Sequence, residues 1–308
     1  MSPQSVTASR LPPPLVIRLS NGVDMPVLGL GTYRLRGDAC TTTVKAAILA
    51  GYRLIDTATA YRNEEDVGAA IANLVQNGTV SRQELFVTTK VSPKDQGEEK
   101  SYAAVLNSLE KLGPSVEYLD LVLIHWPGTA GLKVSDPQNP ANRHGSWQAL
   151  ERLYQDGRVR AIGVSNFLAH HLDDLALHAT ITPHVMQFEF HPAIYAETQP
   201  LLDYLRAHQI VPQAYSSLGE GALLDTARYP FPELYAIAAA RVATPAQVLL
   251  AWALARGVSV VPKTQNVARL AENLVAVQLE LGSDEMNALD HAFAGQTQRF
   301  CWNPAVVV

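Results

Sequence analysis

Four residues that can hold or move a proton stand at or just beyond the ends of short apolar runs. Asp56, Lys90 and His125 each close one run, and Tyr61 follows Asp56 in the next connecting segment. A free phenol has a pKa of about 10, and a neighbouring ammonium lowers that pKa because it favours the phenolate. An Asp beside the Lys would keep the ammonium charged, and a His could hydrogen-bond the substrate oxygen. The set predicts proton donation from Tyr61 to a carbonyl oxygen.

Each of these residues also has a simpler interpretation. Asp56 could cap the following helix, and Tyr61 could be a packed loop aromatic. Lys90 could be solvated, and His125 could be a core histidine. The joint site is favoured because a buried cation and a buried anion at adjacent strand ends need each other as partners. None of the four can supply a hydride, so reduction of a carbonyl would require a redox cofactor.

The elements that must position these residues alternate between two kinds. Eight short apolar runs, the candidate strands, are separated by longer amphipathic segments, the candidate helices. Such alternation implies a parallel sheet, because parallel strands need a crossover connection. The runs are Leu28–Thr32, Arg53–Asp56, Leu85–Lys90, Leu119–His125, Ala161–Val164, Val185–Phe188, Ile210–Tyr215 and Val258–Val261. The helical segments include Thr41–Ala50, Glu64–Gln76, Ser101–Leu112, Trp147–Gln155, Thr198–His208 and Pro245–Arg256.

Eight such units match a closed (β/α)8 TIM barrel, which places its functional residues at the carboxyl ends of the strands. The alternative is an open doubly wound sheet, but the first run holds Gly29-Leu30-Gly31-Thr32-Tyr33 and no GxGxxG phosphate loop. We expect a single barrel domain over residues 15–308, with an N-terminal β-hairpin turning at Asn21-Gly22 and a C-terminal loop. Residues 1–14, polar and Pro-rich, are predicted to be a disordered leader.

Composition excludes several other classes of protein. The net charge of −5 and the lack of a basic stripe argue against nucleic-acid binding. The two cysteines, Cys40 and Cys301, have no CxxC partner, so we expect neither disulfides nor a metal site. No run approaches the roughly 20 apolar residues that span a bilayer. We expect a cytoplasmic protein with no membrane partner.

Several segments have a specific expected environment. The stretch Pro127–Arg143, rich in Gly, Pro and Asn, is predicted to be a long loop on the catalytic face. His170 and His171 are expected to be solvated on a surface helix, and Trp252 is expected in the core.

Five motifs occur in order along the candidate strands. They are Gly51-Tyr52-Arg53-Leu54-Ile55-Asp56-Thr57-Ala58 with Tyr61 and Asn63-Glu64; Leu119 to Pro127; Gly163-Val164-Ser165-Asn166-Phe167; Gln187-Phe188-Glu189-Phe190-His191-Pro192; and Val261-Pro262-Lys263-Thr264 with Arg269, Glu272 and Asn273. With these motifs the chain resembles the aldo-keto reductases from about Leu15 to Pro304. The resemblance implies an NADPH-dependent reductase of aldehydes and ketones, monomeric by the family's default.

The resemblance also implies a role for each catalytic candidate. Tyr61 would be the general acid, Lys90 would lower its pKa, and Asp56 would pair with Lys90. His125 would orient the carbonyl, and a His at this position, where some family members have Glu, favours reduction of C=O over C=C.

The cofactor positions are likewise implied by the resemblance. Ser165, Asn166 and Gln187 would bind the nicotinamide carboxamide, and Tyr215 would stack on the ring. The turn Ser216-Ser217-Leu218 would lie near the pyrophosphate. Lys263, Thr264 and Arg269 would hold the 2′-phosphate, and Glu272 and Asn273 would contact adenine. Thr32 and Asp56 are also among the implied cofactor-binding positions.

One of these assignments has independent support in the sequence. Asn266 to Val277 has helical periodicity, with Val267, Leu270, Leu274 and Val277 on one face and Arg269, Glu272 and Asn273 on another. Two cations, Lys263 and Arg269, beside a helix N-terminus favour a phosphate site and hence NADPH over NADH. A solvated charged face is the alternative.

The expected substrate pocket is lined by Tyr33, Tyr61, His125, Trp126 and Trp302. Tyr33 stands where the family often has Trp, and Ser92 stands where animal aldose reductases have an aromatic. The pocket is therefore expected to be less enclosed than in those enzymes.

Two functions of other classes stay open at this stage. A Schiff-base lyase could use Lys90 or Lys263, although pairing with Asp56 opposes the loss of the Lys90 proton that this chemistry needs. A non-catalytic nucleotide-binding barrel subunit is the other alternative.

Overall fold

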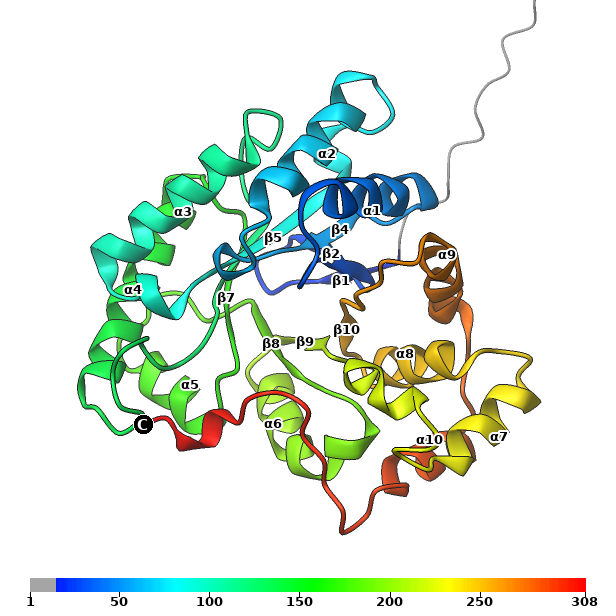
Figure 1. Cartoon of the computed structure of the whole chain (residues 1–308). Coiled ribbons are helices and arrows are strands. Elements are labelled where there is room, and N and C mark those ends of the chain that lie inside the picture. Colours follow the sequence, from blue (N-terminus) through cyan, green and yellow to red (C-terminus); the bar gives the residue numbers. More distant parts are fainter. Residues whose placement is uncertain (1–14) are drawn as a thin grey trace, which may run out of the picture.

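The computed structural model describes residues 15–308, so the predicted leader over residues 1–14 lies outside the described residues. Within them, a ring of parallel strands is surrounded by helices (Figure 1). The barrel strands are β3 (Gly29–Gly31), β4 (Leu54–Asp56), β5 (Phe86–Val91), β6 (Leu121–Ile124), β7 (Ile162–Ser165), β8 (Val185–Glu189), β9 (Val211–Tyr215) and β10 (Ser259–Val260). The predicted (β/α)8 barrel is confirmed.

The strands pair in chain order, and the ring closes between its first and last members. Each neighbouring pair from β3 to β10 is parallel. A parallel bridge joins Leu28 to Val260, and Gly31 N donates to Pro262 O at 3.1 Å. A Cβ on Gly31 would lie 2.6 Å from Val261 O, so the closure requires a residue without a side chain there.

The helices of the described chain cover the outside of the barrel. They are α1 (Gly37–Ala50), α2 (Glu64–Gln76), α3 (Glu98–Leu112), α4 (Gln138–Gln155), α5 (Ala169–Ala176), α6 (Tyr195–Ala207), α7 (Pro232–Ala240), α8 (Pro245–Ala255), α9 (Val267–Val275) and α10 (Ser283–His291). Short 3-10 turns connect them: η1 (Thr59–Tyr61), η2 (Arg82–Glu84), η3 (Pro93–Asp95), η4 (Pro192–Ile194), η5 (Gly219–Leu224), η6 (Ala276–Gln278) and η7 (Pro304–Val306). The first turn of α2 holds Glu64, Glu65 and Asp66, which favour a helix start because they complement the helix dipole.

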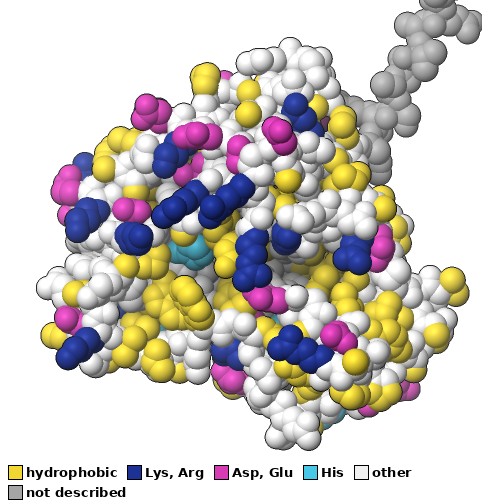
Figure 2. Space-filling model, in the orientation of Figure 1, with side chains coloured by type: hydrophobic (Ala, Val, Ile, Leu, Met, Phe, Trp, Pro, Cys, Tyr) yellow, Lys and Arg dark blue, Asp and Glu magenta, His cyan; other side chains and the backbone are white. Residues whose placement is uncertain are grey.

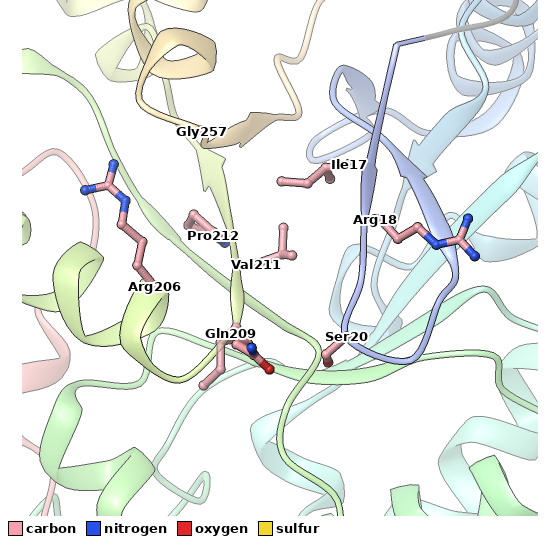
Figure 3. A pocket seen from close by; sticks show the side chains of 9 residues that line it. Ile17, Arg18, Ser20, Arg206, Gln209, Val211, Pro212 and Gly257 are labelled. Atoms are coloured by element: carbon pink, nitrogen blue, oxygen red, sulfur yellow. The ribbon is translucent and has the colours of Figure 1, made fainter.

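An antiparallel hairpin closes the amino-terminal end of the barrel, as predicted. It consists of β1 (Val16–Arg18) and β2 (Asp24–Pro26). Met25 is fully buried against the apolar side chains that point down from the strands, including Leu54 and Phe86. A pocket of about 450 Å3 remains between this hairpin and the start of β9 (Figure 3). The apolar plug leaves the opposite end of the barrel for chemistry.

Three local predictions are wrong. The stretch Pro127–Arg143 is not a loop throughout, because α4 begins at Gln138. His171 is not solvated: it is buried, accepts from Leu168 N at Nδ1 and contacts Val307 O through Nε2 at 2.9 Å. On α9, Val267 is exposed and Asn273 is buried with Leu270, so Asn273 does not share the exposed face of Arg269.

Trp252 is buried in the core, as expected. Among the described residues no single helix has the length and apolar character needed to cross a membrane. Only α7 and α8 taken together pass by length and composition, and they are bent by 94°.

Candidate active site

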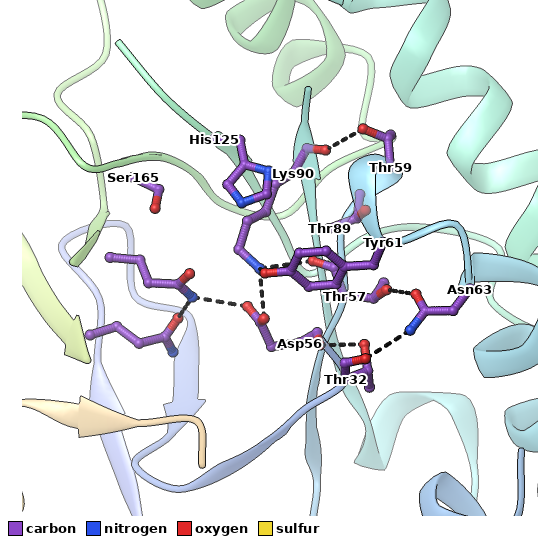
Figure 4. A network of polar contacts seen from close by, with 12 residues as sticks. Thr32, Asp56, Thr57, Thr59, Tyr61, Asn63, Thr89, Lys90, His125 and Ser165 are labelled. Carbon is purple, nitrogen blue, oxygen red and sulfur yellow. Dashed lines mark hydrogen bonds and ion pairs between the residues drawn. The ribbon is translucent and has the colours of Figure 1, made fainter. Parts of the chain in front are cut away.

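The four predicted catalytic residues meet at the carboxyl ends of β4, β5 and β6 (Figure 4). Lys90 is fully buried, and its Nζ lies between two partners from the neighbouring strand and its loop. It donates to Asp56 Oδ1 at 2.6 Å and to Tyr61 Oη at 3.2 Å. A third bond, to Thr57 O at 2.9 Å, satisfies the remaining ammonium proton. The Tyr61 and His125 rings are edge-on, with centroids 5.7 Å apart.

The turn that presents Tyr61 is fastened on both sides. Thr59 Oγ1 donates to Lys90 O at 3.0 Å, which ties η1 to β5. On the other side, Asn63 Nδ2 donates to Thr32 O and Leu35 O, both at 2.9 Å, and Asn63 Oδ1 accepts from Thr57 Oγ1. These bonds hold the phenol at a fixed position relative to Lys90. Beyond its place in the first motif, nothing in the sequence indicated this part played by Asn63.

Burial dominates the electrostatics of the site. It raises the pKa of Tyr61 well above its usual value, and the charge of Asp56 raises it further. The expectation of a lowered Tyr61 pKa is therefore wrong for this structure. Burial also lowers the pKa of Lys90, and Asp56 opposes that shift through its charge and its hydrogen bond. The pKa of His125 falls to about 3, first through burial and then through the charge of Lys90.

These shifts fix the protonation states at neutral pH. Tyr61 keeps its proton and His125 is neutral, so the phenol can donate and the imidazole can donate from one nitrogen only. The three acceptors around Lys90 Nζ favour its ammonium form and oppose its use in a Schiff base.

The aromatic residues expected in the substrate pocket lie around Asp56, Tyr61, Lys90 and His125, the catalytic tetrad. They differ in how exposed their side chains are. Tyr33 is exposed and lies 5.1 Å from the Tyr61 ring, centroid to centroid. Trp126 is half-buried beside His125. Trp302, from the C-terminal segment, meets Trp126 edge-to-face at 6.0 Å and is 79% exposed. All the predicted pocket residues therefore lie at this mouth, and Trp302 forms its outermost edge.

The predicted nicotinamide-binding residues lie on the next three strands. Gln187 Nε2 donates to Asp56 Oδ2 at 2.9 Å, which couples this group directly to the tetrad. Asn166 Nδ2 donates to His125 O at 3.0 Å and to Ser165 Oγ at 3.1 Å. Asn166 Oδ1 accepts from Tyr215 Oη at 2.6 Å. Asn166 is thus already bonded on both sides of its amide, and it adopts a left-handed φ of +63°.

Two supporting residues of this region were not predicted. Gln213 on β9 accepts from Gln187 Nε2 at 2.7 Å. Glu189, buried at the end of β8, accepts from Phe300 N at 2.6 Å and Cys301 N at 3.2 Å, which ties the C-terminal segment to the barrel. A polar residue inside an apolar run, as at Gln213, is the sequence signal that could have identified the first of them.

The turn after β9 has unusual backbone and side-chain features. Ser216 has a φ of +50°, and its Oγ lies 3.3 Å from Cys301 Sγ. Ser217 Oγ is buried and has no hydrogen-bond partner among the described residues. Leu218, half-buried, precedes η5. A buried hydroxyl without a partner is uncommon and points to a polar group that this turn could bind.

The predicted phosphate and adenine residues lie around the start of α9. Lys263 and Arg269 are exposed, and neither forms an ion pair within the described part of the chain. Thr264 is buried and its Oγ1 accepts from Asn266 N at 3.0 Å. Glu272 Oε1 accepts from Thr244 Oγ1 at 2.8 Å. The structure thus leaves the two cations free, while it engages Glu272 and buries Asn273.

Outside this face, three residues with metal-ligating atoms cluster on and after α4 and α5. The ligand atoms of His144, Asp174 and His178 lie within 4.8 Å of one another. Asp174 Oδ2 already accepts from Arg143 at 3.0 Å and contacts His144 Nε2 at 2.9 Å. This carboxylate therefore has protein partners of its own.

Comparisons with known proteins identify relatives of this chain. The model of the "Aldo/keto reductase family" matches residues 27–294. Glyoxal reductase of Bacillus subtilis is 43% identical over 275 residues, 89% of this chain and 91% of that protein. Morphine 6-dehydrogenase of Pseudomonas putida is 39% identical over 289 residues, 91% of this chain and 92% of that protein. The crystal structure of a Bombyx mori aldo-keto reductase in complex with NADP superposes on this chain with a TM-score of 0.83. The two are 30% identical, and the match covers 94% of this chain and 96% of that chain.

Proposed function

Because this chain belongs to the aldo/keto reductase family, we propose that it reduces aldehydes and activated ketones to alcohols with NADPH, with Tyr61 as the general acid. The observation that supports this proposal most directly is the position of Lys90 Nζ. It lies 2.6 Å from Asp56 Oδ1 and 3.2 Å from Tyr61 Oη, beside the His125 ring. A carbonyl oxygen placed between Tyr61 and His125 would meet an acid and a neutral hydrogen-bond donor.

The residues of the mouth fit NADPH. Within residues 15–308 Ser217 Oγ has no hydrogen-bond partner and can bond a phosphate oxygen, and Lys263 and Arg269 have no ion pair and can bind a 2′-phosphate. Ser165, Asn166, Gln187 and Tyr215 would hold the nicotinamide end. When bound, this cofactor supplies the hydride that no side chain can provide.

The proton comes from the chain itself. Tyr61 remains protonated at neutral pH because its burial raises its pKa. As negative charge develops on the carbonyl oxygen, the phenol gives up its proton, and the ammonium of Lys90 stabilises the phenolate that remains. Asp56 keeps Lys90 charged and in place. The neutral His125 orients the carbonyl and does not compete as a proton donor.

The names of two relatives suggest the first substrates to test. One relative is a glyoxal reductase and another a morphine 6-dehydrogenase, so their names cover a small dicarbonyl and a bulky alcohol or ketone. For this chain we propose small aldehydes and dicarbonyls first, because the glyoxal reductase has the higher identity of the two, 43% against 39%. A cytoplasmic location and a monomeric state stay predictions, which fractionation and light scattering would test.

The decisive experiment compares wild type with Tyr61→Phe. We expect carbonyl-dependent loss of NADPH absorbance in wild type, and a fall in kcat of about 10²–10⁴-fold in the variant, the usual contribution of a general acid. NADPH binding, followed by fluorescence, should be nearly unchanged because the hydroxyl faces Lys90 and not the cofactor residues. Substantial turnover by Tyr61→Phe would overturn the assigned role.

A further inference from the structure

A pocket of about 770 Å3 lies directly beside the catalytic turn and takes no part in the mechanism above. Its walls come from η1, from the segment after β5 and from one face of α3. Thr59 and Ala60 in its lining immediately precede Tyr61, and Ser92 follows Lys90 by two positions. The full lining is Thr59, Ala60, Arg62, Ser92, Lys94, Asp95, Lys100, Ala103, Ala104, Asn107 and Lys111. We refer to it as the cationic groove.

The groove has a marked excess of positive charge in a protein whose net charge is −5. Its lining includes the cations Arg62, Lys94, Lys100 and Lys111, against the single carboxylate of Asp95. Within residues 15–308 none of these cations forms an ion pair, although other surface cations such as Arg152 do. Figure 2 shows Lys and Arg side chains gathered around the hollow of this face, over the region between α2, α3 and the barrel mouth. Cations left unpaired in a concave site raise the local concentration of anions.

The groove adjoins the catalytic centre through a small side chain. Ser92 continues β5 in an extended conformation, with φ −66° and ψ 149°. Side chains two positions apart on an extended segment point to the same side, so Ser92 and Lys90 face the same way. Ser92 is 8% exposed, and its hydroxymethyl side chain is the small group that stands between Lys90 and the groove. A substrate that extends from Tyr61 toward the groove would therefore meet only this small side chain at Ser92.

We propose that the cationic groove binds the anionic group, carboxylate or phosphate, of the carbonyl substrate, and so makes the enzyme selective for negatively charged aldehydes. This inference rests on the proposed function for the reacting end of the substrate. Lys94 and Lys100 bind the oxyanion, while Arg62 follows Tyr61 directly in the chain and adds a third positive charge to the lining. Charge-assisted hydrogen bonds of this kind are about twice as strong as neutral ones.

The test compares matched charged and neutral aldehydes. The carboxylate arm uses 4-formylbenzoate against its methyl ester, and the phosphate arm uses glyceraldehyde 3-phosphate against glyceraldehyde. We expect kcat/KM to favour the charged member of at least one pair by about tenfold, and this preference to fall as ionic strength rises. The arm with the larger preference identifies the oxyanion.

The variant is Lys94→Gln with Lys100→Gln, which removes two charges without shortening either side chain much. The charged-to-neutral ratio of kcat/KM should fall about fivefold or more. Arg158→Gln is the control, because Arg158 is an exposed cation that precedes β7, at the opposite end of the barrel. A ratio near one in wild type, or a ratio that the double variant does not change, overturns the proposal.

A binding measurement separates this proposal from the proposed function. Calorimetry should show that 4-formylbenzoate binds the protein more tightly than its methyl ester, and that the double variant loses the difference. If 4-formylbenzoate binds in this way but no aldehyde is turned over, the proposed reductase function is wrong and anion binding by the cationic groove stands. If neutral aldehydes are turned over but the charged and neutral compounds bind equally, the reductase function stands and anion binding by the groove is wrong.

Discussion

The two sides of the barrel mouth are built in opposite ways. On the side of β4 to β6, Asp56 and Lys90 are buried, and Lys90 Nζ already bonds both Asp56 and the half-buried Tyr61. On the side of β10 and α9, Lys263 and Arg269 are exposed and without ion pairs in the described chain. The first arrangement is fixed before any ligand binds, as electrostatic catalysis requires. The second leaves its cations without an ion-pair partner in residues 15–308, as the proposed 2′-phosphate site requires.

Lys90→Met should have the largest effect on both stability and activity, because it removes the cation that bonds Asp56 and Tyr61. Asp56, 3% exposed, would lose its cation and retain only the neutral amide of Gln187 as a side-chain partner, and breaking such a buried pair costs about 3–5 kcal/mol of unfolding free energy. We expect kcat to fall by at least about 10²-fold as well, since Tyr61 loses its cation. Urea denaturation and steady-state kinetics would measure the two losses.

The double variant Lys90→Met with Asp56→Asn separates them. It removes the orphaned charge, so much of the stability should return while activity stays low. Equal instability in the single and double variants would contradict this account of the buried pair.

The double variant Lys263→Met with Arg269→Gln removes the cations beside β10 and α9. It should weaken cofactor binding and leave stability almost unchanged. Because both side chains are exposed and form no ion pair with the described residues, the free energy of unfolding should change by less than about 0.5 kcal/mol. KM for NADPH should rise by about ten- to a hundredfold, as for the loss of hydrogen bonds to a charged group, with kcat little changed. KM for NADH, which lacks the 2′-phosphate, serves as the internal control; a parallel rise in both would argue against a phosphate site.

The burial of His125 should be visible in how the free energy of unfolding changes with pH. Its folded-state pKa of about 3 lies below the usual value of 6.5, so the unfolded chain takes up this proton first as pH falls. The stabilising contribution is complete above about pH 6.5 and is lost progressively toward pH 3. In His125→Gln the slope of unfolding free energy against pH between 6 and 4 should be shallower. Wild-type kcat should show no histidine titration between pH 5 and 8; an inflection that disappears in the variant would refute a neutral His125.

The comparison also explains what the sequence could predict. Asp56, Lys90 and His125 were found because each lies at the end of an apolar run, and strand ends in a barrel meet at one face. The burial of His171 could not be found in this way, since it depends on Val307, far along the chain. Likewise, the start of α4 at Gln138 has Gly, Pro and Asn in its vicinity and reads locally as a loop. There Asn139 is held by contacts outside the helix, accepting from Thr129 N and donating to Lys133 O.

The direction of the Tyr61 pKa shift was missed for a related reason. The sequence showed that a Lys would lie near the phenol, and a neighbouring ammonium by itself favours a lower phenol pKa. It could not show the depth of burial, which raises the pKa of Tyr61 well above its usual value. Charge partners follow from strand topology, whereas desolvation depends on the packing of the whole mouth.

Trp302→Ala should have the smallest effect, because Trp302 belongs to neither side. Its side chain is 79% exposed and touches the mouth through one edge-to-face contact with Trp126. Aromatic pairs of this kind contribute about 0.5–1.5 kcal/mol, and an exposed pair should lie at the low end, so stability should change by less than about 0.5 kcal/mol. Glu189 holds the preceding residues Phe300 and Cys301 by their backbone N–H groups, so the segment itself should stay in place. KM for an aromatic aldehyde should rise about two- to fivefold while that for glyoxal stays constant, because only a bulky substrate reaches the outer edge; an equal rise for both would mean that Trp302 acts on the tetrad.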